Sequence, residues 1–197
     1  MKKYIAEFIG TFTLSFIVLV ALTSGNAFMS VPVMAGLTLA FFVYTIGAIS
    51  GSHINPAVTL GILSVKKISG KDAISYIVAQ LLGAFVAIIM AKGFGFSSSL
   101  AAGLWNGKIF LAEMLGMMFF AFGIASVVYG KVKDEISGLL IGGSLILGII
   151  IAVLAGSHGI LNPAVALALN ALTAVYLFAP IIGSVIGFQI YRVISHD

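Results

Sequence analysis

The chain has 197 residues, of which 61% are hydrophobic and 8% charged, and its mean hydropathy is +1.21. A water-soluble domain carries roughly a quarter charged residues, so this chain has too few charges to cover a water-facing surface. The composition excludes a cytosolic enzyme and indicates a protein dissolved in lipid. The net charge of +4 does not indicate a nucleic-acid partner, because the ten basic residues are scattered between apolar runs. Cysteine is absent, which removes thiolate nucleophiles and Cys-based metal sites.

Apolar stretches long enough to cross about 30 Å of hydrocarbon predict the transmembrane helices. Six of them lie at residues 4–23, 33–50, 71–92, 108–130, 136–155 and 173–192. The first follows a basic head, but no A-x-A-like cleavage site follows it, so it is expected to be a retained span. Two shorter stretches, 55–64 and 162–170, are introduced by Asn-Pro and are too short to cross.

The charges of the connecting segments predict the orientation. Eight basic residues fall on one side of a six-span chain: Lys2, Lys3, Lys66, Lys67, Lys71, Lys131, Lys133 and Arg192. Only Lys92 and Lys108 fall on the other side. The positive-inside rule therefore predicts that both termini face the cytoplasm, in a multi-pass protein of the plasma membrane.

The two halves of the chain, about 4–92 and 108–192, repeat one another. Three pairs of motifs recur: Ala6-Glu7 with Ala112-Glu113, Gly51-Ser52-His53 with Gly156-Ser157-His158, and Asn55-Pro56-Ala57-Val58 with Asn162-Pro163-Ala164-Val165. Each half contains an odd number of spans, so the second half must be inverted relative to the first. The sequence predicts an all-α membrane protein, with six transmembrane helices and two re-entrant half-helices in an inverted repeat. Residues 1–197 form a single channel domain in this interpretation.

Asn-Pro-Ala is a strong helix start. Asn is among the best N-cap residues, and Pro is favoured at the next position because its missing N–H costs nothing there. Helices are therefore expected from Asn55 to about Leu63 and from Asn162 to about Asn170, each roughly 13 Å long at 1.5 Å per residue. That length is half a membrane.

The segments before these helices, 50–54 and 156–161, are expected to be extended arms that reach the midplane. Backbone at that depth is tolerated only inside protein or along a wet cavity. The two positive helix ends then meet at the centre, the Asn oxygens cap them, and the Asn NH₂ groups are free to donate into a channel. The arm carbonyls supply acceptors. This predicts passive permeation of small neutral solutes with cations repelled, and neither an enzyme nor a cofactor.

These residues resemble the aquaporin and glycerol-facilitator (major intrinsic protein) family over nearly the whole chain. The resemblance is carried by Ser50-Gly51-Ser52-His53-Ile54-Asn55-Pro56-Ala57-Val58-Thr59-Leu60-Gly61, by Ala79-Gln80-Leu81-Leu82-Gly83-Ala84 and by Pro180-Ile181-Ile182-Gly183. It implies a right-handed bundle, permeation of water or glycerol in both directions, and a homotetramer with one pore per subunit.

One position departs from the family pattern. The family follows its second Asn-Pro-Ala with Arg, whereas this chain has Val165. The resemblance places the other residues of the outer constriction at Ala35, at Ile149 or Gly148, and at Gly159. This set contains no aromatic ring and no charge, so a wide, apolar outer constriction is expected.

Four further polar residues and several glycines complete the set of candidates. Glu7 and Glu113, equivalent in the repeat, are expected to accept hydrogen bonds from the arms rather than to relay protons. His53 is expected to line the inner half of the pore, and His158 either to line the outer mouth or to cap a loop. No set of residues has the spacing of a metal site. Close helix packing is expected at Gly10, Gly36, Gly83, Gly116, Gly142, Gly143 and Gly183.

Two alternatives to an open channel remain from the sequence. A low-conductance or structural membrane protein of the same fold would keep both Asn-Pro-Ala segments. A secondary transporter fits the inverted repeat, but no intramembrane carboxylate pair for ion coupling is visible.

Overall fold

The computed structural model describes residues 1–25, 29–98, 100 and 105–195, which contain eight helices. They are α1 (Lys2–Thr23), α2 (Val31–Ser50), α3 (Pro56–Ser64), α4 (Gly70–Gly93), α5 (Gly107–Val128), α6 (Asp134–Leu154), α7 (Pro163–Ala168) and α8 (Ala174–Ser195). All but α3 and α7 are long and apolar enough to cross a membrane. The predicted all-helical fold of six spans and two half-helices is confirmed.

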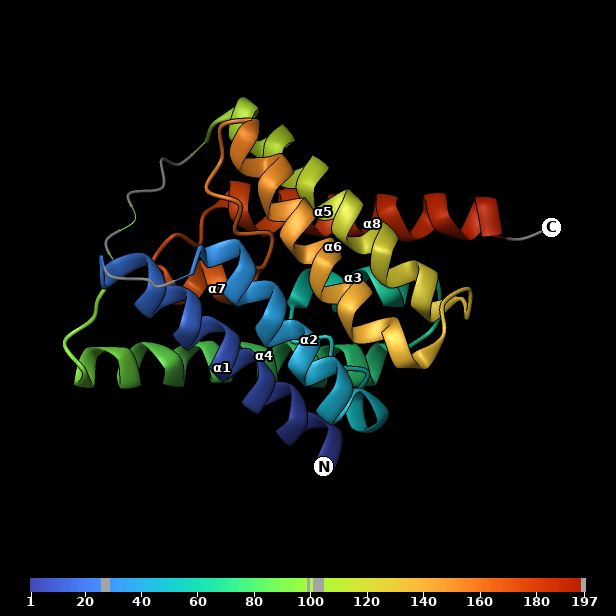
Figure 1. Ribbon diagram of the computed structural model, residues 1–197, viewed down its shortest axis with the longest axis horizontal. Coiled ribbons are helices and arrows are strands. Elements are labelled where there is room, and N and C mark those ends of the chain that lie inside the picture. The colour runs from blue at the N-terminus through green and yellow to red at the C-terminus, as the bar shows by residue number, and fades with distance from the viewer. Residues whose placement is uncertain (26–28, 99, 101–104, 196–197) are drawn as a thin grey trace.

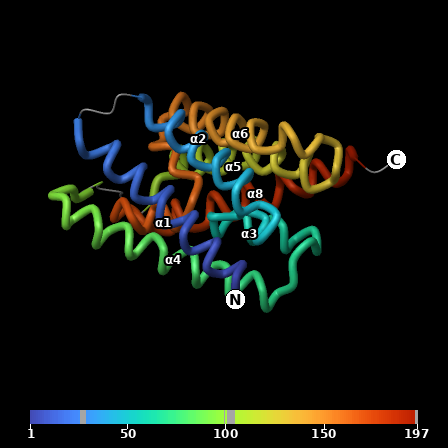
Figure 2. The backbone as a smooth tube through the Cα atoms, turned by 60° about the horizontal axis from the view of Figure 1, so that its bottom comes forward, coloured from blue at the N-terminus to red at the C-terminus, as the bar shows by residue number. Residues whose placement is uncertain are grey.

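The two halves of the chain have matching helix contacts. In the first half α1 packs against α2 and α4, and in the second α5 packs against α6 and α8. The halves join where α2 lies beside α6, as both views show (Figures 1 and 2). The half-helices α3 and α7 lie between the spans, and each also packs against a long helix of the other half, α3 against α8 and α7 against α4 (Figure 1).

The distribution of polarity is that of a protein in lipid. Phe41, Ile74 and Leu139 lie within spans and expose 60%, 67% and 66% of their surface. Glu7 and Glu113 are fully buried. Large exposed apolar faces on six spans need a hydrocarbon environment, so the chain is a multi-pass integral membrane protein.

Glycines on α6 bring this span into close contact with two of its neighbours. A Cβ at Gly142 on α6 would lie 2.4 Å from the carbonyl oxygen of Gly36 on α2. A Cβ at Gly148 on α6 would likewise lie 2.6 Å from the carbonyl oxygen of Gly116 on α5. Gly143 is an exception to the expected packing, because a Cβ there would meet nothing within 4 Å. It follows Gly142 by one residue, about 100° round the helix, and so faces away from α2.

The second half-helix is shorter than expected. It ends at Ala168 rather than near Asn170, because Asn170 adopts a left-handed backbone conformation with φ 56°. The N–H of Ala171 then bonds the carbonyl of Ala166, and the N–H of Asn170 bonds that of Leu167. This is a Schellman cap, and Asn is one of the few residues that tolerate its left-handed position. Lys66 ends α3 in the same way, with φ 60°.

Neighbouring glycines on α6 test the importance of close packing. Gly142→Ala should destabilise the protein by about 1–3 kcal/mol, because the added methyl group overpacks the α2–α6 crossing. Gly143→Ala should be neutral or stabilise by up to about 1 kcal/mol through helix propensity. Thermal unfolding of the two purified variants in detergent measures the difference. Equal midpoints would mean that the crossing is not closely packed in solution.

Candidate functional site

The two Asn-Pro-Ala segments start the half-helices as expected. The Oδ1 of Asn55 accepts the backbone N–H of Ala57 at 2.8 Å, and the Oδ1 of Asn162 accepts that of Ala164 at 2.9 Å. Pro56 and Pro163 occupy the first position of each helix. Both Asn side chains are 3% exposed, so these caps lie inside the protein.

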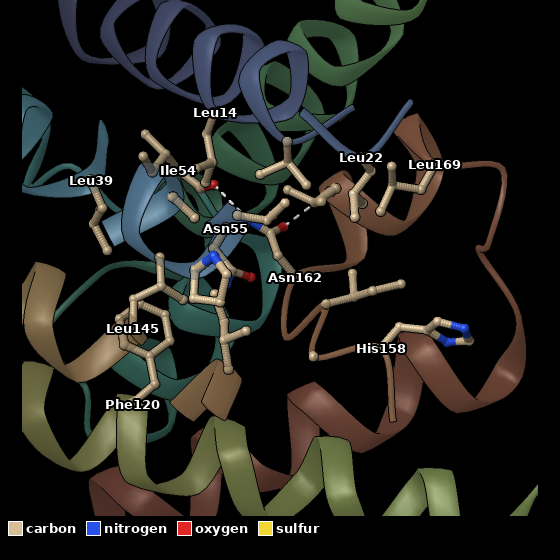
Figure 3. Close-up of a pocket in the computed structure, with 18 of the residues that line it drawn as sticks. Leu14, Leu22, Leu39, Ile54, Asn55, Phe120, Leu145, His158, Asn162 and Leu169 are labelled. Atoms are coloured by element: carbon tan, nitrogen blue, oxygen red, sulfur yellow. Dashed lines mark hydrogen bonds between the residues drawn. The ribbon is translucent and has the colours of Figure 1, made fainter. Parts of the chain in front are cut away.

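The Asn NH₂ groups are not fully free, which corrects the sequence-based expectation. The Nδ2 of Asn55 donates to the carbonyl of Leu161 at 3.0 Å, and the Nδ2 of Asn162 donates to the carbonyl of Ile54 at 3.1 Å. Figure 3 shows the two amides lying side by side in the cavity. Each NH₂ group carries two hydrogens, so one is donated to the opposite arm and the other is left to donate to a solute.

Glu7 on α1 holds the first arm. Its Oε1 accepts the Ser50 hydroxyl at 2.7 Å and the His53 N–H at 2.9 Å, and its Oε2 accepts the Ile54 N–H at 2.7 Å. The side-chain amide of Gln80 on α4 donates to the same Oε2 at 2.8 Å. Backbone N–H groups that no helix satisfies therefore find their acceptor in a buried carboxylate.

Glu113 on α5 holds the second arm in the same way. Its Oε1 accepts the Ile160 N–H at 3.0 Å and the Ser157 hydroxyl, and its Oε2 accepts the Leu161 N–H at 2.7 Å. The residues that donate are the two immediately before Asn162, as they are before Asn55 in the first arm.

These contacts correct the alignment of the two arms. Ile160, not His158, donates to the anchoring carboxylate as His53 does. The residues with left-handed backbone lead to the same alignment. Gly159, with φ 67°, and Ser52, with φ 51°, each lie three residues before their Asn. The arms are therefore not simply extended. The Gly-Ser-His repeat of the sequence is offset by two residues in space, because the second arm is longer.

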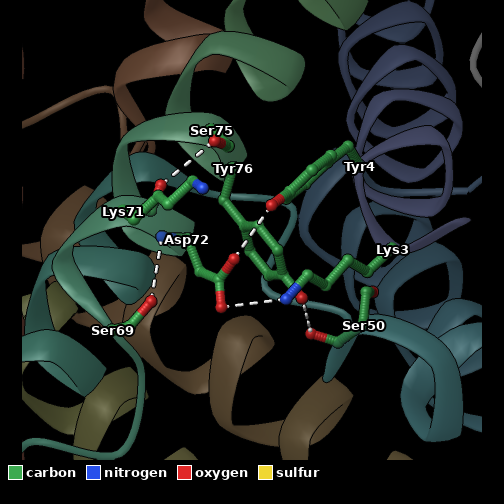
Figure 4. Close-up of polar contacts among 8 residues, drawn as sticks. All are labelled: Lys3, Tyr4, Ser50, Ser69, Lys71, Asp72, Ser75 and Tyr76. Atoms are coloured by element: carbon green, nitrogen blue, oxygen red, sulfur yellow. Dashed lines mark hydrogen bonds and ion pairs between the residues drawn. The ribbon is translucent and has the colours of Figure 1, made fainter. Parts of the chain in front are cut away.

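A polar cluster holds the inner end of the first arm (Figure 4). The hydroxyl of Tyr76 on α4 donates to the carbonyl of Ser50 at 2.8 Å. One turn earlier on α4, Asp72 accepts the hydroxyl of Tyr4 at 2.9 Å and pairs with Lys3 at 2.8 Å. The ion pair is partly exposed and adds little by itself, but the cluster fixes the start of α1 against α4.

Two cavities adjoin near the Asn pair, and they are called outer and inner after the orientation that the connector charges predict. The outer cavity, of about 290 Å³, contains both Asn side chains and extends to His158. The inner cavity, of about 600 Å³, extends to Lys67 and Asp134. Leu39, His53 and Phe120 line both cavities, so the two cavities adjoin at these side chains.

The expected outer constriction residues border the outer cavity. Ala35, Ile149, Gly159 and Val165 are all among its lining residues. Gly148 instead packs against Gly116, so of these two residues Ile149 is the one that lines the cavity. Ala57 and Ala164 lie in the first turns of the half-helices and are fully buried.

Sequence reasoning missed the residues at which the cavities adjoin, Leu39 and Phe120. A signal for Leu39 was available, because residues four apart lie on one face of a helix. The lining residues follow this spacing along three spans: Leu14, Val18 and Leu22 on α1, Ala35, Leu39 and Val43 on α2, and Ile141, Leu145, Ile149 and Val153 on α6. Extending the stripe from Ala35 by one turn would have identified Leu39.

Comparison with known proteins identifies the family. The sequence profile described as Major intrinsic protein matches residues 1–191. The chain belongs to the major intrinsic protein family. It is 34% identical to Glycerol uptake facilitator protein-like 6 of Lactiplantibacillus plantarum, with the whole of both chains covered. It is 31% identical to Aquaporin Z of Rhodopseudomonas palustris, over all of this chain and 94% of that protein. The structure of the aquaglyceroporin from Plasmodium falciparum superposes with a TM-score of 0.69 at 26% identity, over 96% of this chain and 94% of that one.

The buried carboxylates of this major intrinsic protein lead to a prediction on stability. Glu7→Leu or Glu113→Leu should leave arm N–H groups without acceptors, at about 1–3 kcal/mol for each group. Glu→Gln at the same positions keeps one acceptor oxygen and should cost less. Detergent stability and yield measure the order, with the exposed Glu135→Leu as control. If the Leu variants were as stable as the Gln variants, the carboxylates would not hold the arms.

The amide of Asn55 can be separated from its cap. Asn55→Asp keeps the oxygen that caps α3 but removes the donor to Leu161, so we expect loss of stability and of solute flux. Asn106→Asp is the matched control, because Asn106 caps α5 through Oδ1 and has no cross-arm bond. Asn55→Ala should lose the cap as well, typically about 1 kcal/mol more. An Asn55→Asp protein that conducts like the parent would show that the cross-arm donor is dispensable.

Proposed function

We propose that the pore of this protein runs from the inner cavity, past the paired Asn amides, to the outer cavity. The chain is a passive channel for water or small neutral solutes, as its family membership and its relatives indicate. The observation that carries the proposed path is the meeting of two capped half-helices between two adjoining cavities.

The geometry supports permeation without a chemical step. A solute that passes the Asn pair meets one free N–H from each amide, and residues of the arms line both cavities. Apart from the arms and the two Asn caps, the described lining of the outer cavity is apolar, so a solute there forms its hydrogen bonds with the arms and the amides. The positive ends of α3 and α7 face each other at this point, and they disfavour cations.

The assembly and orientation belong to the same proposal. Both termini face the cytoplasm of a plasma-membrane protein, because eight basic connector residues lie on that side and two on the other. Residues 1–197 form one channel domain, and the resemblance to the family supports a homotetramer with one pore in each subunit. Cross-linking in native membranes and protease protection of tagged termini test these points.

We propose the permeant from the residues that border the outer mouth. Ala35, Gly159, Ile149 and Val165 border it with small or aliphatic side chains, and no Asp, Glu, Lys or Arg is among the described lining residues of the outer cavity. The outer cavity, of about 290 Å³, is larger than the volume of about 30 Å³ that one water molecule occupies in the liquid. We infer a permissive mouth that admits glycerol or larger neutral polyols as well as water.

Stopped-flow light scattering on proteoliposomes distinguishes the proposal from its alternatives. Water, glycerol, urea and a larger polyol should each equilibrate faster than in empty liposomes. A structural protein would add no flux for any of them. A proton-coupled transporter would show uptake driven by a pH gradient. The two spanning Glu side chains disfavour coupling, because both are fully buried and their oxygens hold the arms.

Val165 gives the sharpest test of the permeant. Val165→Arg should introduce a positive constriction that reduces glycerol flux more than water flux. Val165→Met adds comparable length without charge and separates size from electrostatics. The ratio of glycerol to water permeability in the same liposomes is the measurement. A parent that conducts water and excludes glycerol, or an unchanged ratio in Val165→Arg, would contradict the permissive mouth.

A further inference from the structure

The two cavities meet at three side chains. The outer cavity, of about 290 Å³, and the inner cavity, of about 600 Å³, are separate volumes. Among the described residues, Leu39, His53 and Phe120 are the ones that line both. Asn55 and Asn162 line the outer cavity and not the inner one. A path that joins the cavities must therefore pass between the three shared side chains, on the inner side of the Asn pair.

The outer mouth is bordered by less bulk than this junction. Of the four residues expected there, Ala35 and Gly159 are small, and Ile149 is the one as large as a leucine. Leu39 lies one turn after Ala35 on α2, and Phe120 adds an aromatic ring from α5. Figure 3 shows both of them on the same side of the paired amides. The bulk that the outer mouth lacks thus lies deeper in the path.

Leu39 and Phe120 are carried by helices that pack closely against α6. Each side chain is 2% exposed. A Cβ at Gly148 on α6 would lie 3.1 Å from the Cβ of Phe120, so the base of the ring has little free space on that side. Gly36, three residues before Leu39, contacts Gly142 at the α2–α6 crossing. Both side chains therefore start from backbone that is held by close packing.

The imidazole of His53 is held from several sides. Its Nδ1 forms a hydrogen bond of 3.2 Å with the hydroxyl of Thr59 on α3. Its ring meets the ring of Tyr76 edge to face, with the centroids 5.0 Å apart, and its backbone N–H is bound by Glu7. A Cβ at Gly51 would lie 3.2 Å from its Nε2. The ring is thus fixed at the junction, where it is the one shared side chain able to hydrogen-bond a solute.

We propose that the size limit of this channel is set just inside the Asn pair, by a central constriction of Leu39, Phe120 and His53, and not at the outer mouth. The proposal rests on the channel function and names the residues that select among its solutes. Because its walls are fixed, the central constriction selects by cross-section. A linear polyol can pass end-on whatever its length, whereas a branched polyol cannot. The preferred solutes are therefore water and linear neutral polyols.

The experiment compares erythritol with pentaerythritol, a linear and a branched polyol with the same number of hydroxyl groups, by stopped-flow light scattering on proteoliposomes. The parent should pass erythritol and nearly exclude pentaerythritol. Leu39→Ala and Phe120→Leu widen the central constriction. The ratio of pentaerythritol to erythritol permeability should then rise roughly tenfold, the lower end of the discrimination that one methylene group gives in an apolar site. Leu39→Phe narrows the constriction and should reduce erythritol permeability more than water permeability.

Matched controls separate a wider constriction from a loss of packing. Leu19→Ala and Phe188→Leu make the same changes at positions that are 1% and 0% exposed and line neither cavity, so the ratio should not change. Leu145→Ala enlarges the outer cavity alone and should raise the ratio far less than Leu39→Ala does. Thermal stability in detergent is measured for every variant. If the widening variants misfold, Leu39→Phe decides, because it removes no packing.

The outcomes separate this inference from the channel function. An equal rise of the ratio in Leu145→Ala and Leu39→Ala would overturn the inference and place the size limit in the outer cavity. A parent that passes both polyols equally fast, or that conducts water and excludes both, would overturn it too. So would an unchanged ratio of erythritol to water permeability in Leu39→Phe. A parent without flux of water, glycerol or erythritol would refute the channel function, and the inference with it.

Discussion

The fold depends on two buried carboxylates that hold backbone outside any helix at membrane depth. Lipid offers no hydrogen bonds, so each arm must find acceptors for its N–H groups within the protein. Glu7 and Glu113 do this from equivalent places on α1 and α5, and both accept from the two residues just before an Asn cap. The position of each half-helix follows from that contact. Because the carboxylates are committed to the arms, they are poorly suited to carry protons.

The second constraint is the exchange of hydrogen bonds across the midplane. Each Asn caps its own half-helix through Oδ1 and binds the opposite arm through Nδ2. The arms of the inverted halves therefore hold each other in place. The glycine crossings of α6 with α2 and with α5 bring the surrounding spans close. The residues at four-residue spacing on α2 and α6 that line the cavities are held in this orientation by the α2–α6 crossing.

Much of this architecture could be predicted from the sequence, for identifiable reasons. The length of the apolar stretches predicts the spans, and Asn-Pro predicts where the half-helices start. The internal repeat predicts that the second half of the chain is inverted relative to the first. Details that depend on the three-dimensional register could not be predicted. The sequence pattern predicts a helix that ends near Asn170, although the tolerance of Asn for left-handed backbone suits the cap that follows a helix. The cross-arm bonds of the amides were missed because they join residues more than a hundred positions apart.

The register of the arms shows why a sequence repeat is not a structural one. Gly-Ser-His occurs in both arms, yet the residues that bind each carboxylate have a fixed position before Asn. They do not have a fixed position after Gly. Gln80 gives the first arm further support by donating to Glu7. Gly83, three residues later, packs over the carbonyl of Phe8. The equivalent residue three before Gly183 is Pro180, which has no side-chain donor.

The carboxylate of the second arm thus has no counterpart of Gln80 at this position, and the arm contains two more residues between its His and its Asn. An insertion at this place leaves the two residues bound to the carboxylate unchanged. It displaces only the residues that precede them, which here include His158. One inverted repeat can therefore give chemically different ends to the same pore. His53 lies beside the Asn pair, while the outer cavity combines an uncharged Val165 with the exposed imidazole of His158.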